Sequence, residues 1–139
     1  GAAHGLQALL PRMMQRRRGI LGVVASAAGY CGLPSAAAYA PSKAALIAMA
    51  ESLRPEAVAA GVDLKLINPG FIKTPLTDKN TFPMPFLMAA DKAADQLVDS
   101  FLRPGFEVTF PKRLAWSMKV LRFLPYPLFF AITRRMGGF

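Results

Sequence analysis

The apolar positions at the start of the chain recur at helical spacing. Leucines and methionines return every three or four residues and predict a helix that ends near Gly19, behind three consecutive arginines. The unbroken apolar run 20–25 then predicts a strand buried on both faces, as in a parallel sheet. Ser26 directly follows this run, so we expect it at the carboxyl end of the strand.

The same alternation of helix and strand continues toward the middle of the chain. A loop rich in glycine, proline and serine leads into an alanine-rich helix that begins near Tyr39 and frays between Pro55 and Gly61. Residues 62–68 predict a second buried strand, which Pro69 ends.

The pattern repeats once more after a proline-containing loop over residues 74–88. Asp91 is the expected capping residue of a third helix, which ends near residue 102. Residues 106–110 predict a third short strand, and a basic helical tail follows Pro111. Strands that alternate with helices of this length predict an α/β fold with a parallel sheet, wound on both faces by right-handed crossovers.

The single cysteine and the single histidine limit the disulfides and metal sites that the chain can form. Cys31 is the single cysteine, so it has no partner for an internal disulfide and a reducing, cytoplasmic setting is expected. The sequence contains no cysteine and histidine cluster for a metal, and the one histidine, His4, is interpreted as a polar surface residue. A metal-dependent reaction is therefore not predicted.

A tyrosine and a lysine form the strongest candidate for proton transfer. Tyr39 and Lys43 are four residues apart in the predicted helix, so their side chains leave one face about a turn apart. An ammonium held near a phenol favours the phenolate, which makes Tyr39 a usable general acid or base. Ser26 follows a buried strand, where open α/β sheets bind their ligands, and can hydrogen-bond a substrate oxygen.

This pair alone is common in helices, and the surrounding motifs make it specific. Ser26 precedes Tyr39 by 13 residues, residues 32–34 between them read Gly-Leu-Pro, and residues 69–74 read Pro-Gly-Phe-Ile-Lys-Thr. In motif and spacing, residues 1–74 closely resemble the short-chain dehydrogenase/reductase family. The remainder is similar to that family only in the order of its elements.

The resemblance implies a role for each of these residues. Tyr39 would be the catalytic acid/base, Ser26 would position the carbonyl, and Lys43 would bind the nicotinamide ribose of NAD or NADP. The motif after the second strand would complete the cofactor site, where the backbone of Ile72 and the hydroxyl of Thr74 meet the carboxamide. The full set of implied cofactor residues is Tyr39, Lys43, Pro69, Gly70, Ile72 and Thr74.

The resemblance also implies an overall architecture and reaction. The chain would be the carboxyl-terminal part of a Rossmann-like domain, with a catalytic portion over 1–111 and a tail over 112–139. The reaction would interconvert a secondary alcohol and a ketone, in a homo-oligomer. An apolar substrate is expected, because aromatic and methionine side chains gather near the proline-containing loop (Phe71, Phe82, Met84, Phe86, Met88).

The family's glycine-rich turn is absent from this sequence. We therefore expect the 139-residue chain by itself to be inactive and to bind NAD(P)H poorly. As the carboxyl-terminal part of such a domain, the chain would also lack the strand that pairs with residues 20–25. These residues would then form an open sheet edge, so the chain is expected to associate.

Charge leaves two interpretations of the tail open. The net charge is +9, and the stretch after residue 107 carries six basic residues and no acidic one. Leu114, Met118 and Leu121 share one helical face, away from the basic side chains. Such a helix either lies on an anionic membrane surface or packs across the substrate pocket. The first interpretation gives the alternative function, a non-catalytic module that binds a membrane or a protein. Nucleic-acid binding is not expected, since no base-reading motif accompanies the charge.

Overall fold

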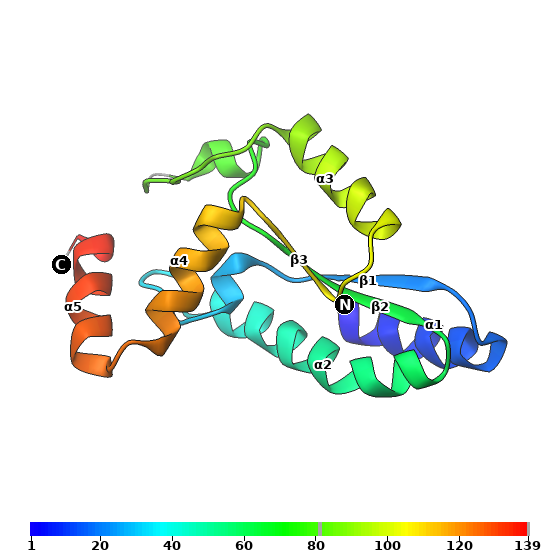
Figure 1. Cartoon of the computed structure of the whole chain (residues 1–139). Coiled ribbons are helices and arrows are strands. Elements are labelled where there is room, and N and C mark those ends of the chain that lie inside the picture. The colour runs from blue at the N-terminus through cyan, green and yellow to red at the C-terminus, as the bar shows by residue number, and fades with distance from the viewer. Residues whose placement is uncertain (81, 139) are drawn as a thin grey trace.

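A three-stranded parallel sheet organises the chain (Figure 1). The computed structural model describes residues 1–80 and 82–138. The elements run in the order α1 (Ala2–Arg16), β1 (Ile20–Val24), η1 (Ala27–Gly29, a 3-10 turn), α2 (Tyr39–Ala59), β2 (Asp63–Pro69), η2 (Thr77–Lys79, a 3-10 turn), α3 (Ala90–Leu102), β3 (Glu107–Phe110), α4 (Lys112–Phe123) and α5 (Tyr126–Gly137).

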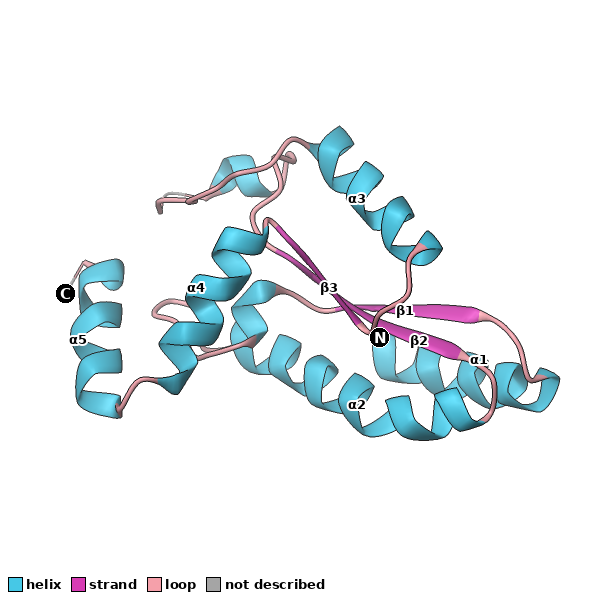
Figure 2. Ribbon diagram, in the orientation of Figure 1, coloured by secondary structure: helices cyan, strands magenta, loops and turns pink. Residues whose placement is uncertain are grey.

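The strands lie side by side in the order β1, β2, β3, with Val23 opposite Leu66 and Ile67 opposite Val108. Helices α1 and α2 cover one face of the sheet and α3 lies on the other (Figure 2). Side chains alternate between the faces along β2: Leu64 and Leu66 join the core under α1 and α2, while Ile67 packs with α3. The predicted α/β class with a parallel sheet and flanking helices is confirmed.

The predicted burial of β1 on both faces is wrong. Ile20 and Val24 remain 46% and 50% exposed, whereas residues 64–68 of β2 are all buried. The difference follows from position, because β1 forms an edge of the sheet and β2 lies between two neighbours. An apolar run of this kind therefore identifies a strand but not its depth.

Helix termini also differ from the prediction. The residue preceding α3 is Ala89, and Asp91 lies in the first turn, where its charge suits the helix dipole without acting as the cap. Arg17, rather than Gly19, adopts the left-handed conformation that ends α1, with φ of 54°. The predicted end of α2 between Pro55 and Gly61 is confirmed, since the helix ends at Ala59.

The basic tail forms two helices that differ in how they are packed. Helix α4 buries Leu114, Met118 and Leu121 against Ala27 and Cys31 of the segment after β1. Helix α5 is less covered: Thr133 is buried, and Tyr126 is 75% exposed. The apolar face of α4 is thus occupied within the molecule. Among the described residues, no helix combines the length and apolarity needed to cross a bilayer.

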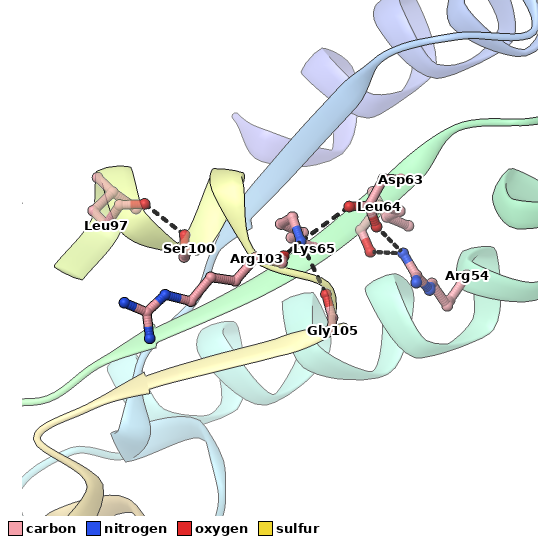
Figure 3. A network of polar contacts seen from close by, with 8 residues as sticks. All are labelled: Arg54, Asp63, Leu64, Lys65, Leu97, Ser100, Arg103 and Gly105. Carbon is pink, nitrogen blue, oxygen red and sulfur yellow. Dashed lines mark hydrogen bonds and ion pairs between the residues drawn. The ribbon is translucent and has the colours of Figure 1, made fainter.

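A buried lysine ties the sheet to the segment after α3 (Figure 3). The Lys65 side chain is fully buried, and its Nζ donates to the carbonyls of Arg103 at 2.8 Å and Gly105 at 3.1 Å. The carboxylate of Asp63 lies 2.9 Å from this ammonium and 2.6 Å from the guanidinium of Arg54. Burial alone would raise the pKa of Asp63, but the two cations hold it below its ordinary value.

Candidate active site

Ser26 caps the short turn η1 at the carboxyl end of β1. Its Oγ accepts a hydrogen bond from the Ala28 N–H at 3.2 Å and donates to the Pro69 carbonyl at 3.4 Å. The side chain is buried at 8% exposure. Two predicted site residues, Ser26 and Pro69, are therefore brought together at the ends of neighbouring parallel strands, where α/β sheets place their ligands.

Tyr39 and Lys43 lie in the first turns of α2. Tyr39 is the first helical residue, and the Nζ of Lys43 is 5.6 Å from the centroid of its ring. Tyr39 is 52% exposed, so about half of its surface is open to solvent. The predicted pairing of the two side chains on one helix face is present in the structure.

Gly29 holds the Ser26 turn against α2. A Cβ placed on Gly29 would be 2.8 Å from the carbonyl carbon of Lys43 and 2.9 Å from the nitrogen of Ala44. Only a residue without a side chain permits this approach of two backbones. The contact brings the turn that carries Ser26 and the helix that carries Tyr39 and Lys43 to one end of the sheet (Figure 1).

The motif after β2 forms a hydrogen-bonded loop. Gly70 donates its N–H to the Phe110 carbonyl at 2.7 Å, which fixes the path of the chain as it leaves the sheet. The Thr77 Oγ1 donates to the Ile72 carbonyl at 2.7 Å and accepts from the Thr74 N–H at 2.8 Å. The hydroxyls of Thr74 and Thr77 are 3.3 Å apart. Thr77 was not singled out from the sequence, although its hydroxyl organises the backbone that carries Ile72 and Thr74.

The predicted apolar residues near the proline-containing loop are divided between two environments. Phe71 packs against the apolar residues that α4 buries, such as Leu114 and Met118. Met88 packs against the apolar residues between β2 and α3, such as Ile67 and Ala93. Phe82 lies with its ring centroid 6.0 Å from that of Phe71, yet it is 49% exposed, and Phe86 is 48% exposed. The loop thus offers exposed aromatic surface on a packed base.

Sequence reasoning missed a polar cluster next to the Ser26 turn, formed by Tyr30, Asn68, Glu107 and Lys119. The Tyr30 hydroxyl donates to Glu107 Oε1 at 2.7 Å and accepts from Asn68 Nδ2 at 3.0 Å. The ammonium of Lys119 pairs with Glu107 Oε2 and lies 5.1 Å from the centroid of the Tyr30 ring. These residues are up to 89 positions apart in sequence, from Tyr30 to Lys119, so no local motif announces them.

The cluster determines the direction in which the pKa values of Tyr30 and Glu107 are shifted. Burial, followed by the hydrogen bond to Glu107 and the charge of that carboxylate, raises the pKa of Tyr30 well above its ordinary value. In this arrangement Tyr30 serves as a hydrogen-bond donor to Glu107. Burial works to raise the pKa of Glu107 as well, but its bonds from Lys119 and Tyr30 hold that pKa below the ordinary range.

A pocket of about 280 Å³ adjoins this cluster on the α2 side of β3, with Tyr30, Glu107 and Lys119 in its wall. It is separate from the Ser26 and Tyr39 side chains, which do not line it. No group of three or more histidine, cysteine, aspartate or glutamate side chains suited to a metal ion occurs within residues 1–80 and 82–138.

Comparison with known proteins places this arrangement in a family. Residues 1–83 match the sequence profile of short chain dehydrogenases. An uncharacterized oxidoreductase of Myxococcus xanthus is 46% identical over 98% of this chain and 54% of its own length. This chain thus spans about half the length of that curated relative.

Solved structures of short chain dehydrogenases are also similar to this chain. A short chain dehydrogenase of Burkholderia cenocepacia in complex with NADP superposes with a TM-score of 0.76 at 25% identity, over 92% of this chain and 52% of that one. A short chain dehydrogenase/reductase of Burkholderia phymatum in complex with NAD has the same fold, with a TM-score of 0.72 at 20% identity, over 85% of this chain and 52% of that one. The chain therefore belongs to the short chain dehydrogenase family of oxidoreductases.

Proposed function

We propose that the protein carrying this chain interconverts a secondary alcohol and a ketone with NAD or NADP, on an apolar substrate. The observation that carries the proposal is the backbone contact of Gly29 with α2, which fixes the Ser26 turn beside the helix turns of Tyr39 and Lys43. A hydrogen-bond donor, a phenol and a cation at one end of a parallel sheet are groups that can bind and protonate a carbonyl oxygen while a bound cofactor would supply the hydride.

Each side chain has a distinct part in the reaction. Tyr39 gives a proton to the carbonyl oxygen in reduction and takes it from the alcohol in oxidation. Ser26 hydrogen-bonds the same oxygen, because its hydroxyl can rotate away from the long 3.4 Å contact with Pro69. Lys43, whose ammonium lies over the Tyr39 ring, places a positive charge beside the phenol.

The donor set of the chain fits the nicotinamide end of the cofactor. Lys43 and Tyr39 offer an ammonium and a hydroxyl to the ribose, and the 70–74 backbone with the Thr74 hydroxyl offers polar groups to the carboxamide. When bound, the cofactor supplies or accepts the hydride. Support for NAD or NADP comes from the Burkholderia cenocepacia relative, which is a complex with NADP.

Substitution of Tyr39 tests the proposal in the full-length protein. Tyr39→Phe should lower kcat by about 10²–10⁴-fold, because the proton donor is removed. Cofactor affinity should fall far less, by about tenfold at most, because only one neutral hydrogen bond to the ribose is lost. The matched control is Tyr126→Phe, which removes the same hydroxyl from an exposed site on α5. Steady-state kinetics with cofactor titration distinguish the two. Wild-type turnover in Tyr39→Phe would refute the assignment of Tyr39.

A second candidate function is contact with an anionic membrane surface through the tail. Helix α5 exposes apolar side chains and carries Arg134 and Arg135, a combination suited to interfacial binding. The exposed apolar residues of this helix are Tyr126, Leu128, Phe130, Ile132 and Met136.

Vesicle sedimentation over a salt series tests this candidate. Binding to vesicles containing phosphatidylserine, lost in high salt and absent with phosphatidylcholine alone, is expected if the tail docks on lipid. The double variant Arg134→Glu, Arg135→Glu should abolish it, whereas Arg12→Glu on α1 should not. Equal sedimentation with both vesicle types would contradict the candidate.

A further inference from the structure

Neighbouring residues of β2 hold the two ends of the turn that carries Ser26. At the first end, the N–H of Ala25, directly before Ser26, donates to the carbonyl of Ile67 at 2.8 Å. At the second end, the Tyr30 hydroxyl accepts from the amide of Asn68, the residue directly after Ile67. The 3-10 turn between these anchors has three residues, Ala27–Gly29, with Ser26 directly before it and Tyr30 directly after it.

The Tyr30 anchor itself is held from the tail. The Glu107 carboxylate accepts from the Tyr30 hydroxyl with one oxygen and pairs with Lys119 of α4 through the other. The Lys119 ammonium lies near the faces of both Tyr30 and Trp116, 5.1 Å and 5.9 Å from their ring centroids. Tyr30 is thus held by β2 through Asn68 and by the consecutive elements β3 and α4 through Glu107 and Lys119.

The arrangement combines an ion pair at the surface with hydrogen bonds to a buried amide. The side chains of Glu107 and Lys119 are 27% and 32% exposed, and Asn68 is fully buried. A hydrogen bond to a charged, partly buried group contributes more than one between neutral groups. The lowered pKa of Glu107 keeps the carboxylate charged, and the raised pKa of Tyr30 keeps the phenol protonated as a donor.

We propose that Tyr30, Glu107 and Lys119 are positioning residues that set the location of Ser26, so that α4 holds part of the active site in place. The proposal rests on the proposed function in one respect only, the assignment of Ser26 to the substrate oxygen. A misplacement of about 1 Å at a positioned group can lower the rate about 100-fold, which is the scale on which such an anchor acts. The tail helix α4 is accordingly part of the catalytic apparatus.

Cys31 provides a readout that does not depend on catalysis. It is the single cysteine of these 139 residues, follows Tyr30 directly, and is buried at 5% exposure in the cluster with Leu114 and Met118. Modification by a soluble thiol reagent therefore requires the turn or α4 to open locally. Its modification rate under native conditions, followed by mass spectrometry of the peptide that contains Cys31, measures how firmly Tyr30 and α4 are held.

The experiment uses the full-length protein and three substitutions. Tyr30→Phe keeps the ring and removes the hydroxyl, Lys119→Met keeps the length of the side chain and removes the charge, and Lys119→Arg restores the charge. Loss of a hydrogen bond to a charged group corresponds to a factor of about ten or more, so Tyr30→Phe and Lys119→Met should raise the Cys31 modification rate by about tenfold. Lys119→Arg should remain close to the wild-type rate.

Kinetics supply the second readout. Tyr30→Phe and Lys119→Met should lower kcat while the KM for the cofactor stays unchanged, because the nicotinamide side of the site is not disturbed. Lys112→Met, an exposed lysine on the same helix, is the matched control and should change neither quantity. The urea midpoint of each variant separates a general loss of stability from a local effect on the turn.

The outcomes distinguish the two proposals. If Tyr39→Phe abolishes turnover but Tyr30→Phe and Lys119→Met leave both kcat and the Cys31 rate at wild-type values, the positioning proposal is wrong and the proposed function stands. If Tyr39→Phe retains turnover, the proposed function fails, while the Cys31 rates still report whether the anchor exists. A faster Cys31 reaction in Lys119→Met without any fall in kcat would also overturn the positioning role.

Discussion

Two tyrosines near Ser26 have opposite surroundings. Tyr39 is 52% exposed and has the Lys43 ammonium 5.6 Å from its ring centroid, with no acidic partner among its described contacts. Tyr30 donates to the Glu107 carboxylate, and its pKa is raised by burial and by that partner. A phenol that must release a proton needs a nearby cation and an approach for substrate, and Tyr39 has both.

Gly29 is the residue whose replacement should be felt most directly at the site. In Gly29→Ala the new methyl group would stand 2.8 Å from the Lys43 carbonyl carbon, so the turn or α2 must move. We expect a loss of about 1–3 kcal/mol in the free energy of unfolding, together with reduced turnover. Urea denaturation of the purified variant measures the first effect.

Gly32→Ala is the matched control for this prediction. A Cβ on Gly32 would meet no atom within 4 Å, although the residue lies in the same loop. Its stability should stay within about 0.5 kcal/mol of the wild type. Equal losses in the two variants would show that the close contact at Gly29 is not the cause.

The buried Lys65 leads to a second prediction at the residue scale. Lys65→Met fills a similar volume but leaves the carbonyls of Arg103 and Gly105 without their donor. The free energy of unfolding should fall by about 1–3 kcal/mol, since an unsatisfied buried acceptor keeps its desolvation cost. Lys92→Met, on the exposed side of α3, is the control and should be nearly neutral in the same denaturation experiment.

At the scale of elements, α4 is attached both by an apolar face and by a polar contact. Leu114, Met118 and Leu121 pack on the Ser26 turn and Cys31, and Lys119 pairs with Glu107 on β3. Of the two interpretations of the tail left open by the sequence, packing within the molecule describes α4. Exposed apolar side chains remain on both tail helices, with Trp116, Val120 and Phe123 on α4 and a larger set on α5.

The contact between β3 and α4 should depend on pH. The native pKa of Glu107 lies below the ordinary value of 4.5, because Lys119 and Tyr30 outweigh the cost of burial. The stabilisation is therefore complete above about pH 4.5 and is lost as the pH falls through the lower native pKa. Asp63 contributes in the same direction, since its pKa is also lowered.

Urea denaturation between pH 3 and pH 7 measures this dependence, roughly spanning the titration of the carboxylates. Glu107→Gln should flatten the decline in unfolding free energy on the acid side, leaving the part that Asp63 contributes. Asp95→Asn, an exposed residue of α3, should leave the curve unchanged. A Glu107→Gln curve parallel to that of the wild type would rule out a role of this carboxylate in acid stability.

At the scale of the whole molecule, the sheet has an open edge at β1. Ile20 and Val24 are 46% and 50% exposed on this strand, and its outer backbone groups face no other strand among those described. Such an edge is a template for pairing with another chain. We expect the 139-residue chain to associate in solution, with an associated fraction that rises with protein concentration.

A charge on this edge should reduce association. Ile20→Lys places an ammonium where a second strand would approach, a device that natural edge strands use. Leu76→Lys is the control, because Leu76 is 76% exposed but lies in the loop after β2, outside the sheet. Light scattering coupled to size-exclusion chromatography compares the masses. Identical association of both variants with the wild type would place the contact elsewhere.

Local patterns were sufficient for the elements and for the residues proposed in catalysis. Apolar runs predicted the three strands, helical spacing predicted the helices around them, and the 13-residue spacing of Ser26 and Tyr39 predicted the family. These features can be predicted because each depends on residues that are close together in the sequence. Side chains repeat about every 3.6 residues on one face of a helix and every two residues on one face of a strand.

Only the tertiary structure showed which residues far apart in the sequence are in contact. The cluster of Tyr30, Asn68, Glu107 and Lys119 exists because the segment after η1 meets β2, β3 and α4, and none of its pairs is closer than 12 positions in sequence. The exposure of β1 was likewise set by its place at the edge of the sheet, since an apolar run is the same in a central and an edge strand. Sequence records the preference of each residue for burial or pairing, whereas the partner and the depth are fixed only when the chain has folded.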